Sequence, residues 1–208
     1  MSAVSSAPKR RTQVERRQAT RAALLDATVS SLVEDGYANT TTRGIAERAR
    51  VSPGALQHHF ASKQELVSEA IAYLNQRVTQ DLIERGLPSA RSGRQLAEQL
   101  IDLLWEVQKG PLIEAAAELL VAARTDPSLR QRLAEAQREA VAMVTATARH
   151  LLPQEAARPG FVDLLSTVLA AQRGMVILGF VSPTEREAAW AAGRAQLLNL
   201  IADWESRS

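Results

Sequence analysis

The amino-acid sequence predicts an all-α protein in which a short N-terminal domain of three helices precedes a larger helical domain. Apolar residues recur at the spacing of amphipathic helices along most of the chain, and no segment after residue 63 alternates as a strand does. Proline and glycine stand between these periodic segments, where helix ends tolerate them. We therefore expect a basic, disordered arm over residues 1–17, the N-terminal domain over 18–63 and the larger domain over 64–208.

Residues 40–63 hold two short helical patterns separated by a tight turn. Thr41 precedes the first as a natural N-cap, and Ile45, Ala46 and Ala49 form its apolar stripe. The second opens with Ser52 as the cap and Pro53 at the first helical position, where a missing N–H costs nothing. Leu56 and Phe60, four residues apart, mark its buried face. Two such helices, crossed and packed, are typical of a helix-turn-helix whose second helix enters the major groove of DNA.

Residues 20–66 as a whole resemble the TetR family of bacterial transcriptional regulators. The matching residues are Gly36-Tyr37, the threonine pair, Ile45-Ala46, Ala49-x-Val51-Ser52, Gly54, Leu56, His59-Phe60 and Ser62-Lys63. The rest of the chain is similar to the family only in its length and helical character. The resemblance implies a homodimer, a double-stranded DNA operator as partner, and an unidentified small-molecule effector bound between the helices of residues 64–208.

Three residues depart from the family pattern. Gln57 stands where a phosphate-binding tyrosine is usual, which shifts the expected contact toward base reading. Gly44 stands where an acid normally completes a capping box with Thr41. Arg50 occupies a turn position usually held by glycine, so we expect a left-handed backbone there at a cost of ~1 kcal/mol, with a cation placed beside the DNA.

The candidate DNA contacts divide into phosphate-binding and base-reading groups. Thr41 and Thr42, at the positive end of a helix dipole, and Lys63, at the start of the next helix, are candidates for phosphates, although Thr41 also serves as a plain N-cap. Arg43 is a candidate for either kind of contact. The groove-facing candidates of the second helix are Ser52, Pro53, Gly54, Ala55, Gln57 and His58, of which Gln57 can pair bidentately with adenine.

The charge distribution favours contact between the N-terminal domain and a polyanion. Residues 1–63 carry ten Lys and Arg against five acids, a net charge of +5, whereas the whole chain carries +2 and the remaining residues therefore −3. The basic stretch from Lys9 to Arg21 is either a solvated tail or an arm that adds minor-groove contacts.

The larger domain divides into six predicted helices. A capping-box pattern at 62–65 begins the first, which is expected to end near residues 86–88. The others are expected at about 93–109, 112–124, 127–152, 161–181 and 183–204.

The last two helices have more apolar surface than one core requires. Apolar residues occupy nearly every face of 161–181, and two stripes run along the final helix, one with Trp190, Leu197, Ile201 and Trp204 and one with Ala188, Ala191, Ala195 and Leu198. These helices are either simply well buried or form a dimer interface. A dimer is favoured because one recognition helix alone reads too few base pairs. The interface candidates are Val168, Met175, Trp190, Leu197 and Ile201.

Four residues are candidates for the lining of an effector pocket: Trp105, Glu118, Gln172 and Arg173. Each is out of place in its apolar helix, although such a residue is more often at the edge of the core or in an intrachain ion pair. Ligand binding is expected to move the helix after Lys63, which changes the spacing of the recognition helices and releases DNA.

Several other classes of protein are disfavoured. The chain has no cysteine, no Ser-His-Asp order and no Gly-rich phosphate loop, so we expect neither an enzyme nor a cofactor. His58 and His59 are adjacent and point about 100° apart on a helix, so no metal site is expected. No signal sequence or bilayer span is expected, and the protein is predicted to be cytoplasmic. The remaining alternatives are a co-repressor-dependent or activating DNA binder and a helical protein-interaction module.

Overall fold

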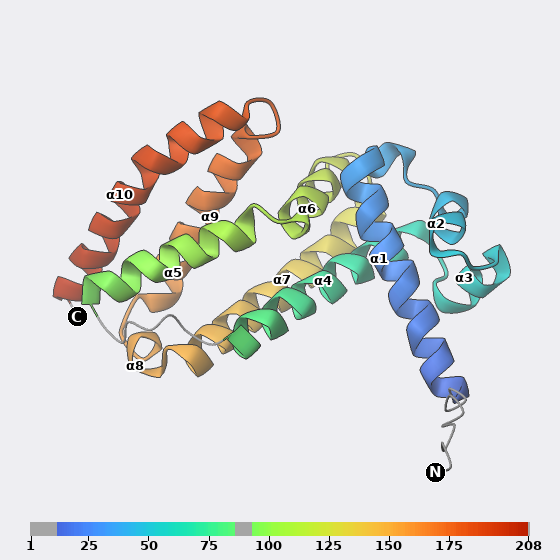
Figure 1. The fold of residues 1–208 in the computed structure, drawn as a ribbon, viewed down its shortest axis with the longest axis horizontal. Coiled ribbons are helices and arrows are strands. Elements are labelled where there is room, and N and C mark those ends of the chain that lie inside the picture. The colour runs from blue at the N-terminus through green and yellow to red at the C-terminus, as the bar shows by residue number, and fades with distance from the viewer. Residues whose placement is uncertain (1–11, 86–92, 208) are drawn as a thin grey trace, which may run out of the picture.

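The computed structural model describes residues 12–85 and 93–207, and every regular element within them is a helix (Figure 1). The all-α prediction is confirmed. The elements in chain order are α1 (Gln13–Asn39), α2 (Thr42–Ala49), α3 (Pro53–His59), α4 (Lys63–Arg85), α5 (Gly93–Gln108), α6 (Pro111–Ala122), α7 (Pro127–Leu151), α8 (Pro153–Ala156), α9 (Phe161–Leu178) and α10 (Pro183–Arg207).

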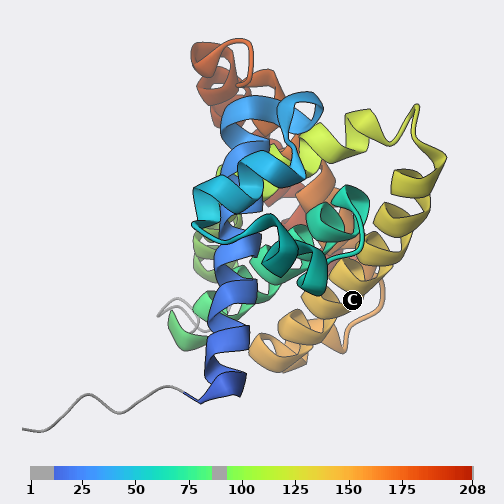
Figure 2. The same ribbon diagram turned by 90° about the vertical axis from the view of Figure 1, so that its right-hand side faces the viewer.

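The N-terminal unit consists of α1, α2, α3 and the first turns of α4. Apolar residues from all four elements meet in one core, which includes Leu24, Ile45, Leu56, Phe60 and Leu66. Figure 2 shows α2 and α3 lying across α1, on the side of the molecule remote from α9 and α10. This packing leaves the outer faces of α2 and α3 exposed.

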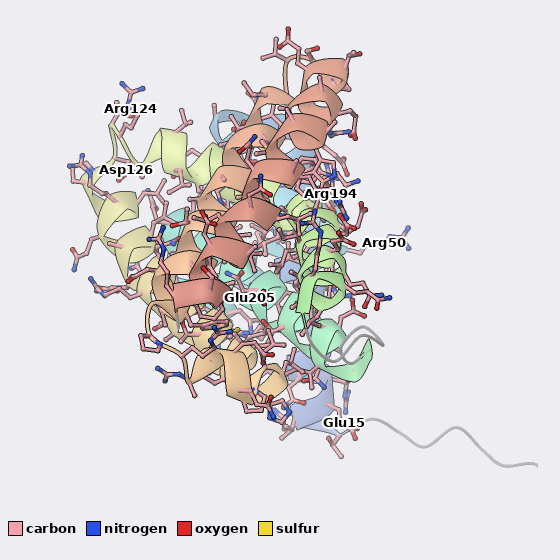
Figure 3. All side chains as sticks on the ribbon, turned by 90° about the vertical axis from the view of Figure 1, so that its left-hand side faces the viewer. Glu15, Arg50, Arg124, Asp126, Arg194 and Glu205 are labelled. Carbon is pink, nitrogen blue, oxygen red and sulfur yellow. The ribbon has the colours of Figure 1, made fainter. Side chains whose placement is uncertain are left out.

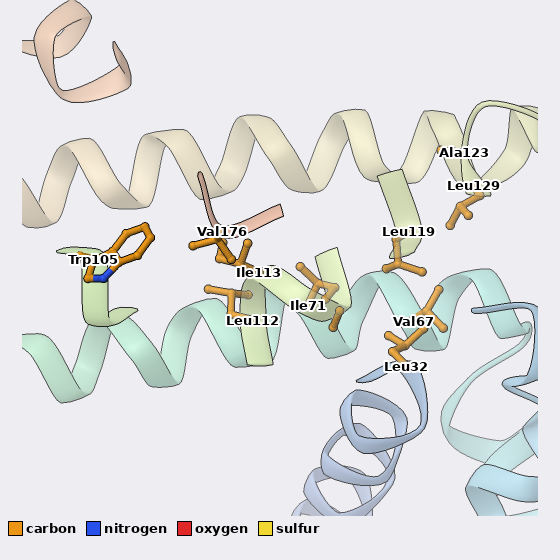
Figure 4. Packing of buried hydrophobic residues seen from close by; sticks show 11 residues of the cluster. Leu32, Val67, Ile71, Trp105, Leu112, Ile113, Leu119, Ala123, Leu129 and Val176 are labelled. Atoms are coloured by element: carbon orange, nitrogen blue, oxygen red, sulfur yellow. The ribbon is translucent and has the colours of Figure 1, made fainter. Parts of the chain in front are cut away.

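The larger domain, which we call the body, has two layers joined by α6. The first layer is α4 packed on α7, and the second is α5, α9 and α10, whereas α6 packs against α1, α4, α7 and α9. A continuous core extends from Leu32 and Val67 beside the N-terminal unit to Val176 and Trp105 in the second layer (Figure 4). A smaller core lies between α5, α9 and α10.

The helices begin and end close to their predicted positions, with three differences: at the start of α1, at the start of α4 and at α8. α1 begins at Gln13 with a capping box between Thr12 and Glu15, so the arm expected over 1–17 was too long, and residues 1–11 lie outside the described part. At the start of α4, Ser62 caps Glu65 as predicted, but the Glu65 carboxylate reaches back to the N–H of Ala61 instead of that of Ser62. The expected end of α4 at 86–88 lies outside the described residues, and α8 was not expected.

The apolar character of α9 meets the minimal criteria for a membrane span. Its 18 residues have a mean hydropathy of 1.5, which makes it long and apolar enough to cross a membrane by length and composition only. This helix nevertheless carries Asp163 and Arg173, and it packs along α5 and α10. These contacts are those of a helix within a helical body.

Candidate DNA-binding surface and its connection to the body

The turn between α2 and α3 has the predicted left-handed residue. The Thr41 hydroxyl accepts a hydrogen bond from the N–H of Gly44 at 3.0 Å, which caps α2 without the second half of a capping box. Arg50 ends the helix at φ 57° and ψ 42°, and it is the one non-glycine residue with positive φ among those described. The strain at Arg50, ~1 kcal/mol for a residue with a Cβ, is confined to a position that projects a cation outward.

The recognition helix α3 is anchored on one face and open on the other. The Ser52 hydroxyl accepts from the N–H of Ala55 at 3.2 Å, and Leu56 and Phe60 are each 2% exposed in the core. Five of the six predicted groove-facing residues are exposed: Ser52, Pro53, Gly54, Gln57 and His58. The sixth, Ala55, is half-buried. A Cβ at Gly54 would meet nothing within 4 Å, so the protein's own packing does not require glycine there.

The cations around α3 are not equally available. Arg43 is exposed and pairs with Glu47 at 2.9 Å along α2, an ion pair that water screens. Arg50 protrudes from the ribbon (Figure 3). Arg48, in contrast, bonds to Glu34 and Asp35 of α1 at 2.6 and 3.1 Å and so holds α2 in place. The expected surface thus has Thr41, Thr42, Arg43 and Arg50 beside the exposed face of α3.

Lys63 is engaged inside the protein, contrary to the expectation of a free phosphate-binding cation. Its Nζ donates to the carbonyl of Tyr37 at 2.6 Å and lies 3.9 Å from the centre of the Tyr37 ring. Partial burial lowers the pKa of the Lys63 ammonium. The residue therefore ties the start of α4 to the end of α1 and has to share or leave this contact to reach DNA.

Tyr37 is the point where the N-terminal unit meets the body. Its N–H donates to Oε2 of Glu118 on α6 at 3.0 Å. Gly36 just before it has φ 75°, and a Cβ there would lie 3.1 Å from the same carboxylate oxygen. We call the contacts of Tyr37 with Lys63 and Glu118 the Tyr37 joint. Glu118, predicted to line a pocket, accepts this backbone N–H with its carboxylate, and its part in a pocket stays a prediction. In the sequence, Gly36 before Tyr37 is a local sign of such a close approach.

The other predicted pocket residues lie in the core of the body. Trp105 is 2% exposed and stacks on Trp190 with ring centres 4.4 Å apart, so it fills the core instead of lining an opening. Gln172 is fully buried and donates to the carbonyl of Ile101 at 2.9 Å. Arg173 is half-buried on the next position of α9.

A groove of about 600 Å³ runs between α1 and α4 where α6 begins, and none of the four predicted residues lines it. Its walls include Asp26, Val33, Leu74, Arg77 and Pro111. Arg77 and Asp26 form an ion pair at 2.8 Å across it.

The five predicted dimer-interface residues pack within their own chain, two of them fully buried and three half-buried, and their part in an interface stays a prediction. Val168 and Leu197 are buried in the core with α5, and Trp190 and Ile201 pack against that core. Met175 packs on α10, where the end of its side chain fills the space beside Gly193. The size of the side chains does not reveal which of two apolar stripes on a helix faces inward.

The other stripe of each helix is exposed. On α9 it consists of Ser166, Ala170, Gly174, Ile177 and Leu178, and on α10 of Ala188, Ala191, Ala192, Ala195 and Asn199. We call these residues the outer face of α9 and α10. Phe180 and Val181, 50% and 91% exposed, continue it at the connection between the two helices.

Comparison with known proteins places this geometry among bacterial regulators. Residues 24–70 match the model of the bacterial regulatory proteins of the tetR family. The chain is 36% identical over 140 residues to the transcriptional repressor Rv3405c of Mycobacterium tuberculosis, covering 62% of this chain and 73% of that protein. It is 34% identical over 124 residues to the regulator CymR of Pseudomonas putida, which is 60% of this chain and 61% of CymR.

The fold has close counterparts among solved structures. A transcriptional regulator from Rhodococcus sp. Rha1 superposes with a TM-score of 0.65 at 24% identity, covering 86% of this chain and 96% of that one. FadR from Bacillus subtilis, solved in complex with stearoyl-CoA, superposes with a TM-score of 0.62 at 15% identity, with the same coverage of 86% and 96%. Among the described residues, no group of three or more His, Asp or Glu is placed to hold a metal ion.

Proposed function

Because the chain belongs to the TetR family of bacterial regulatory proteins, we propose that it is a dimeric repressor that binds a palindromic operator and leaves it when a small molecule binds the body. The observation that carries the proposal is the exposed face of α3, whose polar and small residues serve no packing in the chain itself. Such a regulator acts on DNA in the cytoplasm.

On DNA, α3 would lie in the major groove with Gln57 toward the bases. The exposed amide of Gln57 matches the donor and acceptor of adenine, and the bare backbone at Gly54 allows close approach. Thr41 and Thr42 begin α2, where backbone N–H groups favour a phosphate, and Arg43 and Arg50 supply charge. Base contacts would then come from α3 and positioning contacts from α2.

The outer face of α9 and α10 is the proposed dimer interface. Its small residues, Ala170 and Gly174 on one helix and Ala191 and Ala195 on the other, would let helices of two copies approach closely. A two-fold dimer presents two α3 helices to successive major grooves about 34 Å apart. Symmetry of the protein thereby explains a palindromic operator.

The Tyr37 joint is the proposed route from the body to the recognition helix. α6 packs within the core of the body, and its Glu118 holds the Tyr37 N–H, so a shift of α6 pulls on the end of α1. Lys63 transmits the same shift to α4, immediately after α3. A ligand that binds the released state about 100-fold more tightly contributes about 2.7 kcal/mol to the change. The complex of FadR with stearoyl-CoA supports the view that a protein of this fold can bind a small molecule.

The test is selection of bound duplexes from random-sequence DNA, followed by binding of the selected duplexes at increasing salt. We expect an enriched inverted repeat, an affinity that falls steeply with salt, and a selective loss for Gln57→Ala. Gln131→Ala, an exposed glutamine on α7, is the matched control and should leave binding unchanged. Absence of an enriched motif, or binding that ignores salt, would refute the proposal and favour a protein-interaction module.

A further inference from the structure

Gln172 and Arg173 of α9 form a polar site in the body with atoms that no other described group satisfies. Gln172 is fully buried, its Nε2 donates to the carbonyl of Ile101, and its Oε1 has no hydrogen-bond partner. The Nε of Arg173 is also buried without a partner. Buried polar groups of proteins are almost always hydrogen-bonded, so two neighbouring exceptions require an explanation.

The charge of Arg173 is uncompensated within the described chain. No carboxylate among the described residues pairs with it, and burial lowers the pKa of its guanidinium, with no neighbouring acid opposing that shift. Arg194 on α10 shows the contrast, because it bonds to both carboxylate oxygens of Asp102 at 2.7 Å. A guanidinium that is partly buried without a counter-charge is unfavourable, and a bound anion relieves that cost.

Arg173 lies on α9 between the buried side that includes Val176 and the outer face that includes Ile177. Met175 marks the side of α9 that faces α10, and Val176 marks the side that packs with α6 in the main core. Arg173 lies about 100° around the helix from Gln172, on the side of Val176 and away from Met175.

α7 has few close contacts with the second layer of the body, because it packs mainly on α4. Only Leu129 of its 25 residues is fully buried, and its apolar residues Met143 and Val144 are half-buried. A ligand between α7 and the second layer would therefore displace few existing contacts.

From these observations we infer that Gln172 and Arg173 bind a small organic monoanion, a carboxylate attached to an apolar body. A guanidinium donates two parallel hydrogen bonds to a carboxylate and balances its single negative charge. A phosphate dianion would keep one negative charge that Arg173 does not balance. The apolar body would extend from Arg173 toward α7, which has few close contacts with α5 and α9. The free Oε1 of Gln172 would accept from a hydroxyl or N–H of the ligand. This inference rests on the proposed effector-controlled regulator.

The experiment compares carboxylates with their uncharged primary amides. Benzoate, 4-phenylbutyrate and decanoate, each beside its amide, are added to the purified full-length protein, and the melting temperature is measured. We expect at least one carboxylate to raise the melting temperature by several degrees while its amide does not. Arg173→Gln should remove this difference, and Arg149→Gln, an exposed arginine on α7, should keep it. A difference that survives in Arg173→Gln, or the absence of any difference in the wild type, overturns the inference.

A second variant separates an unpaired Arg173 from one that a partner subunit neutralises. Arg173→Met keeps the length of the side chain and removes the charge, so without ligand it should melt higher than the wild type. A lower melting temperature would mean that Arg173 already has a carboxylate partner in the dimer, which also overturns the inference. Duplex selection run in parallel keeps the two proposals distinct, because failure to find an operator counts against the regulator and leaves the comparison of carboxylates with amides intact.

Discussion

The N-terminal unit and the body are both built from amphipathic helices. They differ in how completely each region covers its own apolar surface and pairs its own polar groups. In the N-terminal unit, caps, ion pairs and core contacts account for nearly every group that does not face outward. Thr40, for example, is 1% exposed and bonds to both Ser31 and the carbonyl of Gly36. In the body, an apolar outer face and two buried polar atoms have no partner among the described residues.

Under the proposed function, this difference corresponds to the partners of the two regions. The N-terminal unit would meet DNA with a surface that its own packing already fixes, whereas the outer face and the buried polar atoms of the body would be satisfied by a second subunit and a ligand.

The largest effect is expected from removing the anchor of α3. Phe60→Ala deletes a buried ring from the core of the N-terminal unit and should lower the free energy of unfolding by ~3–5 kcal/mol. Chemical denaturation measures this loss, and operator binding should vanish with it. Val121→Ala, at a residue of α6 that is 66% exposed, should change the free energy of unfolding little. Equal losses in the two variants would contradict the view that α3 depends on this core.

A charge on the outer face should separate the subunits without unfolding them. Ala191→Glu places a carboxylate on the outer face of α10 and should convert dimer to monomer in sedimentation experiments. Operator affinity should fall about 100-fold, because each monomer presents a single α3. Leu197→Glu is the opposite case, since Leu197 is buried within its own chain and the change should unfold the body. A dimer that persists in Ala191→Glu would move the interface elsewhere.

The sequence predicted the N-terminal unit better than the body for a physical reason. Caps such as Thr41 and Ser52, the proline at the start of α3 and the left-handed Arg50 are set by neighbouring residues, so local patterns reveal them. The orientation of α9 and α10 depends on which stripe packs on α5. Both stripes are apolar or small, so the sequence pattern could not reveal that Trp190 and Leu197 pack within their own chain. The Tyr37 joint joins residues 81 positions apart and left no local trace besides Gly36.

A smaller effect is expected at the Tyr37 joint. Glu118→Ala removes the acceptor of the Tyr37 N–H and should cost ~1 kcal/mol of stability. Hydrogen exchange of the Tyr37 amide should become faster. A higher concentration of ligand should be required to release the operator. Glu135→Ala, an exposed acid on α7, provides the comparison. Unchanged exchange at Tyr37 would show that Glu118 does not hold this backbone in solution.

The smallest predicted effect has opposite signs for stability and DNA binding. Arg50→Gly removes a Cβ from a left-handed residue and should stabilise the protein by ~0.5–1 kcal/mol. It also removes a cation beside the DNA, so affinity should fall for all sequences and the salt dependence should weaken by about one phosphate contact. Arg50→Asn also loses the charge but tolerates the left-handed backbone, so its DNA binding should show the same weakened salt dependence as that of Arg50→Gly. A salt dependence that stays at the wild-type value would place Arg50 away from the DNA.

The proposal that a dimer places two α3 helices on DNA is tested most directly by hydroxyl-radical footprinting of the full-length protein on a selected operator. Two protected segments related by two-fold symmetry, with centres about one helical turn apart, are expected from two α3 helices in successive major grooves. Gln57→Ala should weaken both segments equally, because each subunit contributes one copy of the residue. A single protected segment, or protection unaffected by Gln57→Ala, would contradict the account.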